Sequence, residues 1–396
     1  MNPVEVVENV YWVGAVDWNL RDFHGYETRR GTTYNAYLIV DEKKALVDTV
    51  KHPFRGMLVD RIRKVTSLED INYIIINHIE KDHSSSLPYI MQQAQKATIV
   101  TTERGKEGLT KYYGEHGWNF LTVKTGDELN LGNKTLKFVE APMLHWPDSM
   151  FTYLQEDSVL MPNDAFGQHL ASSQRFDDEI DWDVLMDEAA KYYANILMPM
   201  ASLIVRKIEE LRDLGLKPKI IAPSHGIIWR SSPEKIVSLY LEWSKGEVEK
   251  AAVIVYDTMW GSTEKMAYEI AEAIGRSGVK VKLFRLHVSD KAEIMKEILN
   301  AKAVIIGSPT INNSMFLTVS AFLTYVIGLR PREKVWATFG SYGWGGGAVR
   351  KINKLLEEAR FEVIEPSVQA QYAPTEDDLQ RCRELGGKIV EMIKSK

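Results

Sequence analysis

The segment Asn72-Tyr-Ile-Ile-Ile76 precedes, after one intervening residue, the segment His78-Ile-Glu80-Lys-Asp82-His83. The first segment is a continuous, mainly apolar run, which is typical of a strand buried on both faces. If the chain continues in extended form, alternation puts the first histidine and both acidic side chains of the second segment on one side. We expect the last histidine to turn in beside them. Because such groups are costly to hold together without a cation, the segment predicts a metal site.

Three further residues are candidate ligands, because each lies at or just beyond a strand end, where metal sites on such scaffolds are built. They are His145, Asp164 and His225. With the segment 78–83 they supply four imidazoles and three carboxylates, which suffice for two metals if one carboxylate bridges. Oxygen and imidazole ligands without a thiolate suit iron or manganese as well as zinc.

The remaining pattern divides the chain near residue 248. In residues 1–248 we expect strands at 34–40 and 44–48 as a hairpin, at 97–101, at 135–140 and at 220–222, and helical spacing over 187–214. In residues 250–396, strand-like and helix-like segments alternate regularly. Strands are expected at 252–256, 280–285, 304–307, 334–339 and 362–364. Helices are expected at 263–276, 291–299, 317–326, 348–359 and 377–393. Such β/α repeats predict a doubly wound parallel sheet.

Three loops of the second domain follow strand ends that meet at one edge of this sheet. The first offers hydroxyls, a glycine and a helix N-terminus to a single phosphate, and it lacks the lysine of a Walker A loop. The other two converge where a planar ring would lie, and they carry aromatic side chains. The candidate cofactor-binding residues are Thr258, Met259, Trp260, Gly261, Ser262, Thr263, Pro309, Thr310, Ile311, Asn312, Asn313, Ser341, Tyr342, Gly343, Trp344, Gly345 and Gly346.

Composition excludes several classes of protein. A single cysteine, Cys382, rules out an internal disulfide and a protein-bound iron–sulfur cluster. The net charge of −5 and the lack of a basic run argue against a nucleic-acid partner. The N-terminal residues do not resemble a signal peptide, and no apolar run approaches the roughly 20 residues of a membrane helix. We therefore expect a cytoplasmic protein without a membrane partner.

These motifs resemble two known families in succession. The second domain is similar to flavodoxin, which implies FMN. The first resembles the metallo-β-lactamase superfamily, whose usual motif is His-x-His-x-Asp-His, but Glu80 stands in place of the second histidine. That departure and the domain order resemble the flavodiiron proteins. The expected fold is α/β: a metallo-β-lactamase-like αββα sandwich over residues 1–248, followed by a flavodoxin-like sheet over 250–396.

The resemblance assigns the ligands. It implies that His78, Glu80 and His145 hold one iron, that Asp82, His83 and His225 hold the other, and that Asp164 bridges them. In some members of the family the imidazole equivalent to His83 turns away. We expect His24, Tyr192 and Trp146 to line the distal pocket and donate to a metal-bound oxygen species, with His24 and Tyr192 as the catalytic candidates.

The resemblance also implies an oxidoreductase that reduces O2 to water, NO to N2O, or both, for stress defence in an anaerobe. Its cofactors would be FMN and two non-haem iron ions. Electrons would arrive from an external donor: rubredoxin, an NAD(P)H-dependent reductase acting through rubredoxin, or a reduced deazaflavin. The expected assembly is a head-to-tail homodimer or a dimer of dimers, in which FMN of one subunit serves the iron site of the other.

Two other functions stay open. A zinc hydrolase with an accessory flavodoxin-like module would contain two zinc ions, and a pure electron carrier would leave the metal site empty. We interpret His52, His116, His169 and His287 as surface or packing residues, Asp48 as a turn residue or a neighbour of the ligands, and Cys382 as unrelated to either site.

Overall fold

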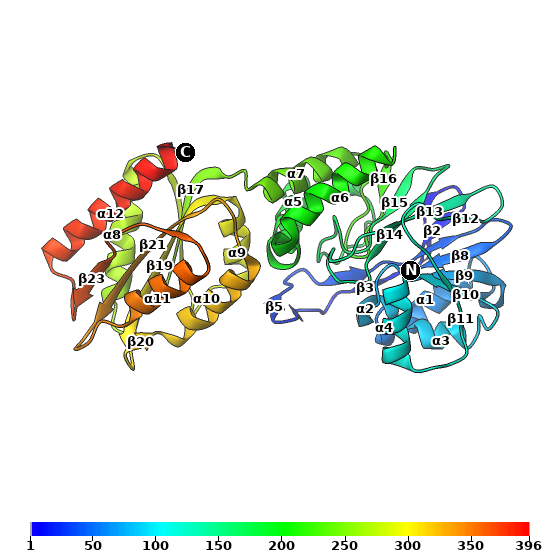
Figure 1. Cartoon of the computed structure of the whole chain (residues 1–396), viewed down its shortest axis with the longest axis horizontal. Helices are drawn as coiled ribbons and strands as arrows, with labels where there is room; N and C mark the ends of the chain where they lie inside the picture. Colours follow the sequence, from blue (N-terminus) through cyan, green and yellow to red (C-terminus); the bar gives the residue numbers. More distant parts are fainter. Residues whose placement is uncertain (1, 396) are drawn as a thin grey trace. The chain divides into compact units, whose positions relative to one another are not determined.

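The structure is a computed structural model that describes residues 2–395. Its contacts define two compact units, each described by itself (Figure 1). The first unit contains the described residues up to Tyr193 and Met200–Leu241, and the second contains Ala194–Pro199 and the described residues from Glu242 onward. Among the described residues, no helix has both the length and the apolar composition needed to cross a membrane.

The first unit contains two facing sheets. A seven-stranded sheet has the order β1-β2-β7-β8-β9-β10-β11, and a five-stranded sheet has the order β12-β13-β14-β15-β16. The strands of the first sheet are β1 (Val4–Val7), β2 (Val10–Trp12), β7 (Tyr37–Ile39), β8 (Lys44–Val47), β9 (Ile71–Ile75), β10 (Thr98–Thr101) and β11 (Asn119–Thr122). Those of the second are β12 (Glu128–Asn130), β13 (Thr135–Glu140), β14 (Met150–Leu154), β15 (Val159–Met161) and β16 (Ile220–Ile221).

Two ribbons lie outside these sheets. The strands β3 (Ala15–Asp17) and β6 (Thr32–Tyr34) pair with each other, as do β4 (Asp22–Phe23) and β5 (Tyr26–Glu27). The α-helices of the unit are α1 (Arg55–Ile62), α2 (Lys81–Ser84), α3 (Leu87–Met91), α4 (Glu103–Tyr113), α5 (Trp182–Tyr192), α6 (Ala201–Asp213) and α7 (Pro233–Lys245), the last extending into the second unit.

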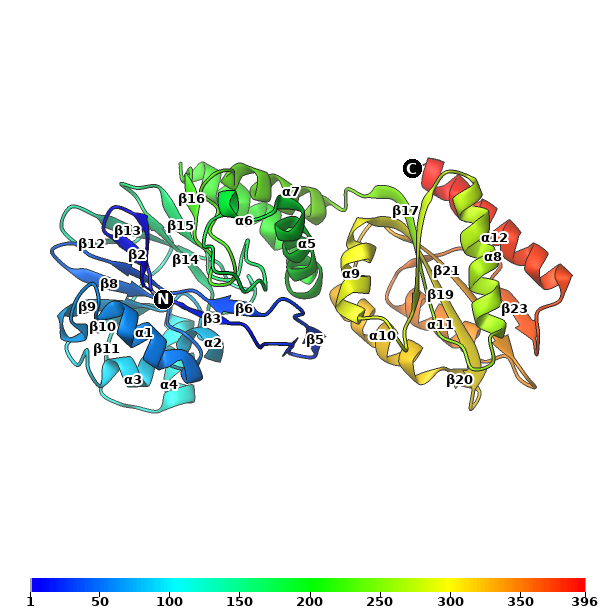
Figure 2. The same ribbon diagram turned by 180° about the vertical axis from the view of Figure 1, so that it is seen from behind.

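Burial explains the layers. Side chains such as Tyr37 and Ile75 of the first sheet pack against Phe138 and Leu154 of the second, so one apolar core lies between the sheets. The opposite face of the seven-stranded sheet packs against α1, α3 and α4 in a second core, for example through Ile74. The helices α5 and α6 lie beside β15 and β16 in both Figure 1 and Figure 2. The predicted αββα sandwich is confirmed.

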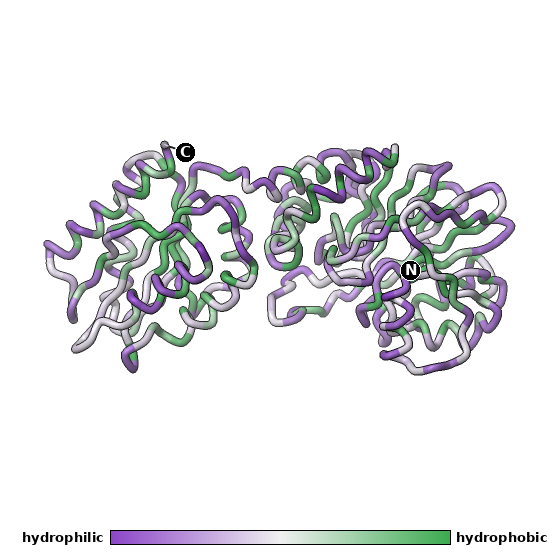
Figure 3. Tube along the Cα trace, viewed as in Figure 1, coloured by the Kyte–Doolittle hydropathy of each residue, from purple (hydrophilic) through white to green (hydrophobic). Residues whose placement is uncertain are grey.

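The second unit is a parallel sheet in the order β18-β17-β19-β21-β22, with β23 also beside β21 and β20 beside β19. This is the flavodoxin-like strand order 2-1-3-4-5. The strands are β17 (Glu249–Tyr256), β18 (Lys280–Arg285), β19 (Ala301–Ile311), β20 (Ser314–Met315), β21 (Val335–Tyr342), β22 (Glu362–Val363) and β23 (Val368–Gln371). Hydrophobic stretches concentrate in its central strands (Figure 3).

The five predicted helices of this unit are confirmed. They are α8 (Ser262–Arg276), α9 (Lys291–Asn300), α10 (Leu317–Leu329), α11 (Ala348–Glu358) and α12 (Glu376–Ser395). The helices α8 and α12 bury their apolar side chains, such as Ile270 and Leu385, against one face of the sheet. Cys382 is buried in this core, which agrees with its interpretation as unrelated to either site.

Three sequence expectations need correction. The strand predicted at 34–40 is interrupted at Asn35 and Ala36, between β6 and β7. Residues 81–84 form one helical turn, in which the N–H groups of His83 and Ser84 donate to the Glu80 carbonyl, so the ligand segment is not fully extended. The loop expected after residue 307 continues as β19 to Ile311 and turns into β20 through Asn312 and Asn313, both with positive φ.

Candidate functional site

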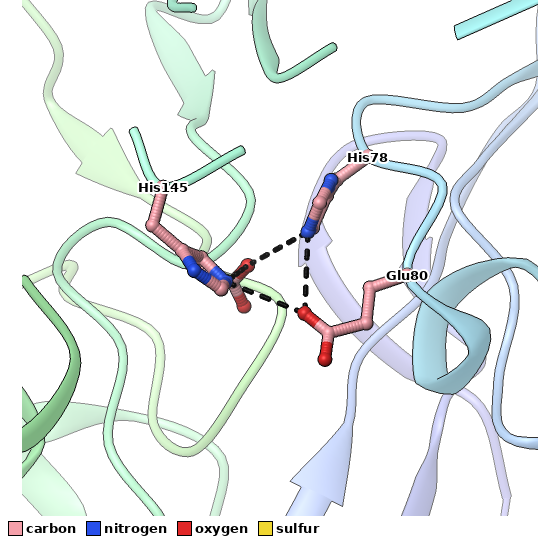
Figure 4. Close-up of side chains that lie close together, drawn as sticks. His78, Glu80 and His145 are labelled. Carbon is pink, nitrogen blue, oxygen red and sulfur yellow. Dashed lines mark hydrogen bonds and ion pairs between the residues drawn. The ribbon is translucent and has the colours of Figure 1, made fainter. Parts of the chain in front are cut away.

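The seven candidate ligands of the first unit converge, and they form two groups. One contains His78, Glu80, His145 and Asp164, and the other contains Asp82, His83 and His225. Within each group the ligand atoms lie within 4.8 Å of one another. In Figure 4, His78 and Glu80, from the loop after β9, and His145, from a separate loop, point toward one another. The structure therefore brings together every residue that the sequence proposed as a metal ligand.

The first group is arranged around carboxylate oxygens. His78 Nε2 lies 3.3 Å from Glu80 Oε2, and His145 Nε2 lies 3.4 Å from the same oxygen. His145 Nε2 is also 3.3 Å from Asp164 Oδ2. The side chains of His78 and Asp164 are buried, whereas His145 retains 18% exposure, so this group lies nearer the surface.

The second group uses the other oxygen of Asp164. His83 Nε2 is 3.2 Å and His225 Nε2 is 3.4 Å from Asp164 Oδ1. His225 Nε2 is 3.1 Å from Asp82 Oδ2. The carboxylate of Asp164 thus presents one oxygen to each group, as a bridging ligand requires. The helical turn at 81–84 explains how Glu80 and Asp82 reach different groups although they are two residues apart.

Unsatisfied polar atoms test whether cations fit these groups. Both oxygens of Asp82, Oδ2 of Asp164 and both ring nitrogens of His83 are buried without a hydrogen-bond partner among the described residues. Leaving such atoms unpaired costs about 1–3 kcal/mol each, and more when they are charged. Divalent cations would satisfy them, and the mixed imidazole and carboxylate ligands suit iron. The residues fit a two-metal centre.

The pKa values show how strongly this site favours positive charge. Burial works to lower the pKa of His78, but hydrogen bonds to Asp148 and Glu80 outweigh it and raise the pKa to about 9. Burial also works to lower the pKa of His145, but Asp164 and Glu80 outweigh it and raise the pKa to about 10. The neighbouring imidazoles hold the pKa of Asp164 well below its usual range against burial. A bound metal would replace these imidazole protons.

Neighbouring groups orient two of the imidazoles. His78 Nδ1 lies 3.0 Å from Asp148 Oδ2, and His225 Nδ1 lies 2.6 Å from the carbonyl oxygen of Thr33, to which it can donate. In both rings Nε2 therefore faces the carboxylates. Such partners fix the ring orientation of metal-binding histidines.

The expected distal residues lie beside the groups. His24 Nε2 is 2.7 Å from Glu80 Oε1, and its side chain is 65% exposed on the turn between β4 and β5. The hydroxyl of Tyr192 donates to Asp164 Oδ1 at 3.1 Å, and burial raises the pKa of Tyr192 well above its usual value. The indole of Trp146 packs edge-on against the His78 ring, with centroids 5.0 Å apart.

His169 matters more than the sequence suggested, whereas Asp48 is a neighbour of the ligands, in agreement with one of its two interpretations. His169 is buried as a packing residue, but it packs on the site: its ring centroid lies 5.0 Å from that of His225. Its Nε2 is 2.8 Å from the hydroxyl of Tyr26. Asp48 accepts hydrogen bonds from Asn77 and Asn163, the residues that precede His78 and Asp164. No local motif marks the role of His169. His52, His116 and His287 are exposed, as expected.

In the second unit, the predicted phosphate loop leads into α8. The helix starts after Gly261, whose φ is +86°, and no side chain caps its N-terminus. Thr258 Oγ1 accepts the Gly261 N–H at 3.1 Å, and Thr263 Oγ1 lies 2.8 Å from Ser341 Oγ. The first N–H groups of α8 are thus available to an anion, which the helix dipole also favours.

The two ring-flanking loops lie at the same carboxyl edge of the sheet. Thr310 Oγ1 accepts N–H groups from Gly347 and Ala348, which joins the β19 and β21 loops. A Cβ on Gly347 would lie 2.5 Å from the Asn313 carbonyl oxygen, so only glycine permits this approach. Trp260 and Trp344 are 94% and 93% exposed. Leaving this much apolar indole surface in water costs free energy, and a flavin ring packed against the indoles would cover it. These loops fit FMN.

Comparisons with known proteins agree with this geometry. Residues 32–226 match the family described as ODP family beta lactamase, and residues 254–386 match flavodoxin. The chain is 51% identical over 394 residues to a nitric oxide reductase of Moorella thermoacetica, with 99% of both chains covered. It superimposes on rubredoxin oxygen:oxidoreductase from Desulfovibrio gigas with a TM-score of 0.98 at 38% identity, covering 100% of this chain and 99% of that one. For the flavodiiron protein from Giardia intestinalis the TM-score is 0.97 at 35% identity, covering 100% and 97%.

Proposed function

Because this chain belongs to the flavodiiron protein family, we propose that it reduces O2 to water, NO to N2O, or both. The protein is an oxidoreductase whose flavodoxin domain binds FMN and whose β-lactamase-like domain carries a diiron centre. One relative is named a nitric oxide reductase and one solved structure a rubredoxin oxygen:oxidoreductase, which supports both gases as substrates. Defence of an anaerobe against these gases is the role that this chemistry would serve.

The observation that carries the proposal is the position of Asp164. Its Oδ2 lies 3.3 Å from His145 Nε2 and its Oδ1 lies 3.2 Å from His83 Nε2. We assign His78, Glu80 and His145 to one iron, Asp82, His83 and His225 to the other, and Asp164 to both. When bound, FMN and the iron pair supply up to four electrons, the number that reduction of O2 to water needs, whereas coupling of two NO molecules needs two.

The chain's own side chains hold the protons that both reductions consume. Tyr192 stays protonated at neutral pH, because burial raises its pKa, and its hydroxyl donates toward the bridging position at Asp164. His24 Nε2 lies 2.7 Å from Glu80 Oε1, and its exposed ring lies between this carboxylate and solvent. We propose these two as catalytic residues. Trp146 shields the first group on the His78 side.

The loops Thr258–Thr263, Pro309–Asn313 and Ser341–Gly346 are proposed to hold FMN. The N-terminus of α8 would bind its phosphate, and Trp260 and Trp344 would contact the ring. We propose that an external donor reduces the flavin: rubredoxin, a reductase acting through rubredoxin, or a reduced deazaflavin. We propose a head-to-tail homodimer or a dimer of dimers, and a monomer with full turnover would contradict it.

A pair of variants tests the function. Glu80→Ala and Asp164→Ala remove one carboxylate each from the metal groups. The proteins would be chemically reduced in the absence of air and then given a known amount of O2 or NO. Gas consumption, iron content and FMN content would be measured. We expect consumption to fall at least tenfold with FMN retained. Consumption at the wild-type rate would reject the diiron role, and comparison of the wild-type rates assigns the preferred gas.

A further inference from the structure

The interrupted strand between β6 and β7 has a second role. Asn35 lies at this interruption and is fully buried. Its backbone N–H leaves the strand ladder and donates to the Ser224 carbonyl at 2.7 Å. Its side-chain amide donates to the carbonyls of Pro223 and Gly226, at 2.8 and 3.1 Å. One residue thus binds the backbone on both sides of His225.

The orientation of the Asn35 amide is itself fixed. Its Oδ1 accepts the indole N–H of Trp12 at 2.8 Å, and Trp12 is 1% exposed. The indole can only donate, so it determines which end of the amide is the oxygen. Both amide hydrogens must then point to the loop that carries His225.

Thr33 supplies the remaining contacts on the same side. Its hydroxyl accepts the Gly226 N–H at 2.6 Å, and its carbonyl lies 2.6 Å from His225 Nδ1. Gly226 has a φ of +78°, and a Cβ there would lie 1.9 Å from Gln168 Oε1, so the opposite side of this turn packs closely against Gln168, whose Oε1 also accepts the Ile227 N–H at 2.7 Å. The turn that bears His225 is held from both sides.

From these contacts we infer that Asn35 is a positioning residue for one of the two metals. It fixes the loop 223–226 so that His225 Nε2 faces Asp82 and Asp164, at 3.1 and 3.4 Å. None of its hydrogen bonds reaches the loops that carry His78, Glu80 or His145. Loss of its amide should therefore loosen the metal held by Asp82, His83 and His225 and spare the other. The inference rests on the metal assignment proposed above.

The experiment uses the full-length protein as purified. Asn35→Asp keeps the size of the side chain but replaces two donors by oxygen, which faces the Pro223 and Gly226 carbonyls. Iron per chain and the rate of iron transfer to an external chelator would be measured under anaerobic conditions. Changing groups that orient a metal ligand typically costs 10–100-fold in affinity. We expect two kinetic phases, with one iron lost at least tenfold faster and the other at the wild-type rate.

Two further variants sharpen the result. Asn130→Asp alters an exposed amide in the same unit and should release iron like the wild type. Thr33→Val removes the hydroxyl that accepts the Gly226 N–H, so it should accelerate the same phase as Asn35→Asp, and it replaces that variant if the latter fails to fold. Equal acceleration of both irons, or no acceleration, would overturn the inference. A wild-type chain without two irons would instead reject the metal assignment.

Discussion

The carboxylate of Asp48 accepts the backbone N–H of Asn77 at 2.8 Å, immediately before His78. Its other oxygen accepts the side-chain amides of Asn77 and Asn163, at 3.2 and 3.3 Å. Asn163 precedes Asp164, so one buried carboxylate joins the loops that carry a ligand of the first group and the bridging carboxylate. Asp48 itself has a φ of +57°, in the left-handed region that residues with side chains seldom adopt.

Replacement of Asp48 by alanine should therefore weaken both metal positions. The variant leaves the backbone N–H of Asn77 and the Asn163 amide without their acceptor and removes one of the two acceptors of the Asn77 amide, which keeps the Met161 carbonyl. This loss should cost about 2–4 kcal/mol in the free energy of unfolding. Iron content should fall at both positions, unlike the selective loss expected for Asn35→Asp. Iron analysis with thermal unfolding would check this. Retention of both irons at the wild-type chelation rate would contradict the proposed link.

The sequence predicted the elements whose signals are local. The strands and helices of the second unit, the ligand segment after β9 and the loops at strand ends all follow from patterns within short stretches of the chain. The interruption at Asn35 could not be predicted, because its partners Pro223 and Gly226 lie 188 and 191 residues away. Within the segment 34–40, Asn35 and Ala36 are weak strand formers, but strong strand formers flank them on both sides, so the local pattern does not show that Asn35 leaves the ladder.

Other misses have the same cause. His169 gives no signal of its own, because its position beside His225 depends on Thr32, to which its Nδ1 is hydrogen-bonded at 2.8 Å. The strands β14 and β15 were not predicted, although their residues are all buried. Their register is determined by β13, which pairs with β14. The position of His169 and the strands β14 and β15 therefore depend on tertiary contacts, which the periodicity of the sequence does not show.

Loss of an exposed indole should weaken FMN binding without weakening the fold. Trp344 is 93% exposed, so Trp344→Ala removes few contacts of the protein alone. A ring contact contributes about 0.5–1.5 kcal/mol beyond area burial, so the Kd for FMN should rise about 3- to 10-fold or more. Fluorescence titration with FMN would measure it. Leu121→Ala, on β11 of the first unit, is the control, and an unchanged Kd in Trp344→Ala would exclude the ring contact.

Restoring the second histidine of the superfamily motif should change the preferred metal. Glu80→His replaces an oxygen ligand beside His78 and His145 by nitrogen, which reduces the negative charge of the first group. The site should then bind more zinc relative to iron, because imidazole nitrogen is a better ligand for zinc than the harder carboxylate oxygen that it replaces. Elemental analysis after growth with both metals would give the ratio. An unchanged ratio with full gas consumption would show that Glu80 does not select the metal.

Lys334 should make the stability of the protein depend on pH. Burial, with the charge of Lys302 next, lowers the pKa of Lys334 from 10.5 to about 7, although its Nζ donates to the Leu299 carbonyl at 2.8 Å. Between these two values the unfolded chain holds a proton that the folded chain has released. The free energy of unfolding should therefore rise with pH across this window, and below pH 7 the full penalty of the buried charge applies.

Lys334→Met removes this penalty. We expect the variant to be more stable than the wild type by about 3 kcal/mol at pH 6.5, from a pKa difference worth about 1.4 kcal/mol per unit and discounted for the lost hydrogen bond. The difference should shrink steadily toward pH 10. Urea unfolding followed by circular dichroism at several pH values would measure it, with the exposed Lys265→Met as control. A difference that is constant with pH would mean that Lys334 keeps its proton in the folded state throughout this range.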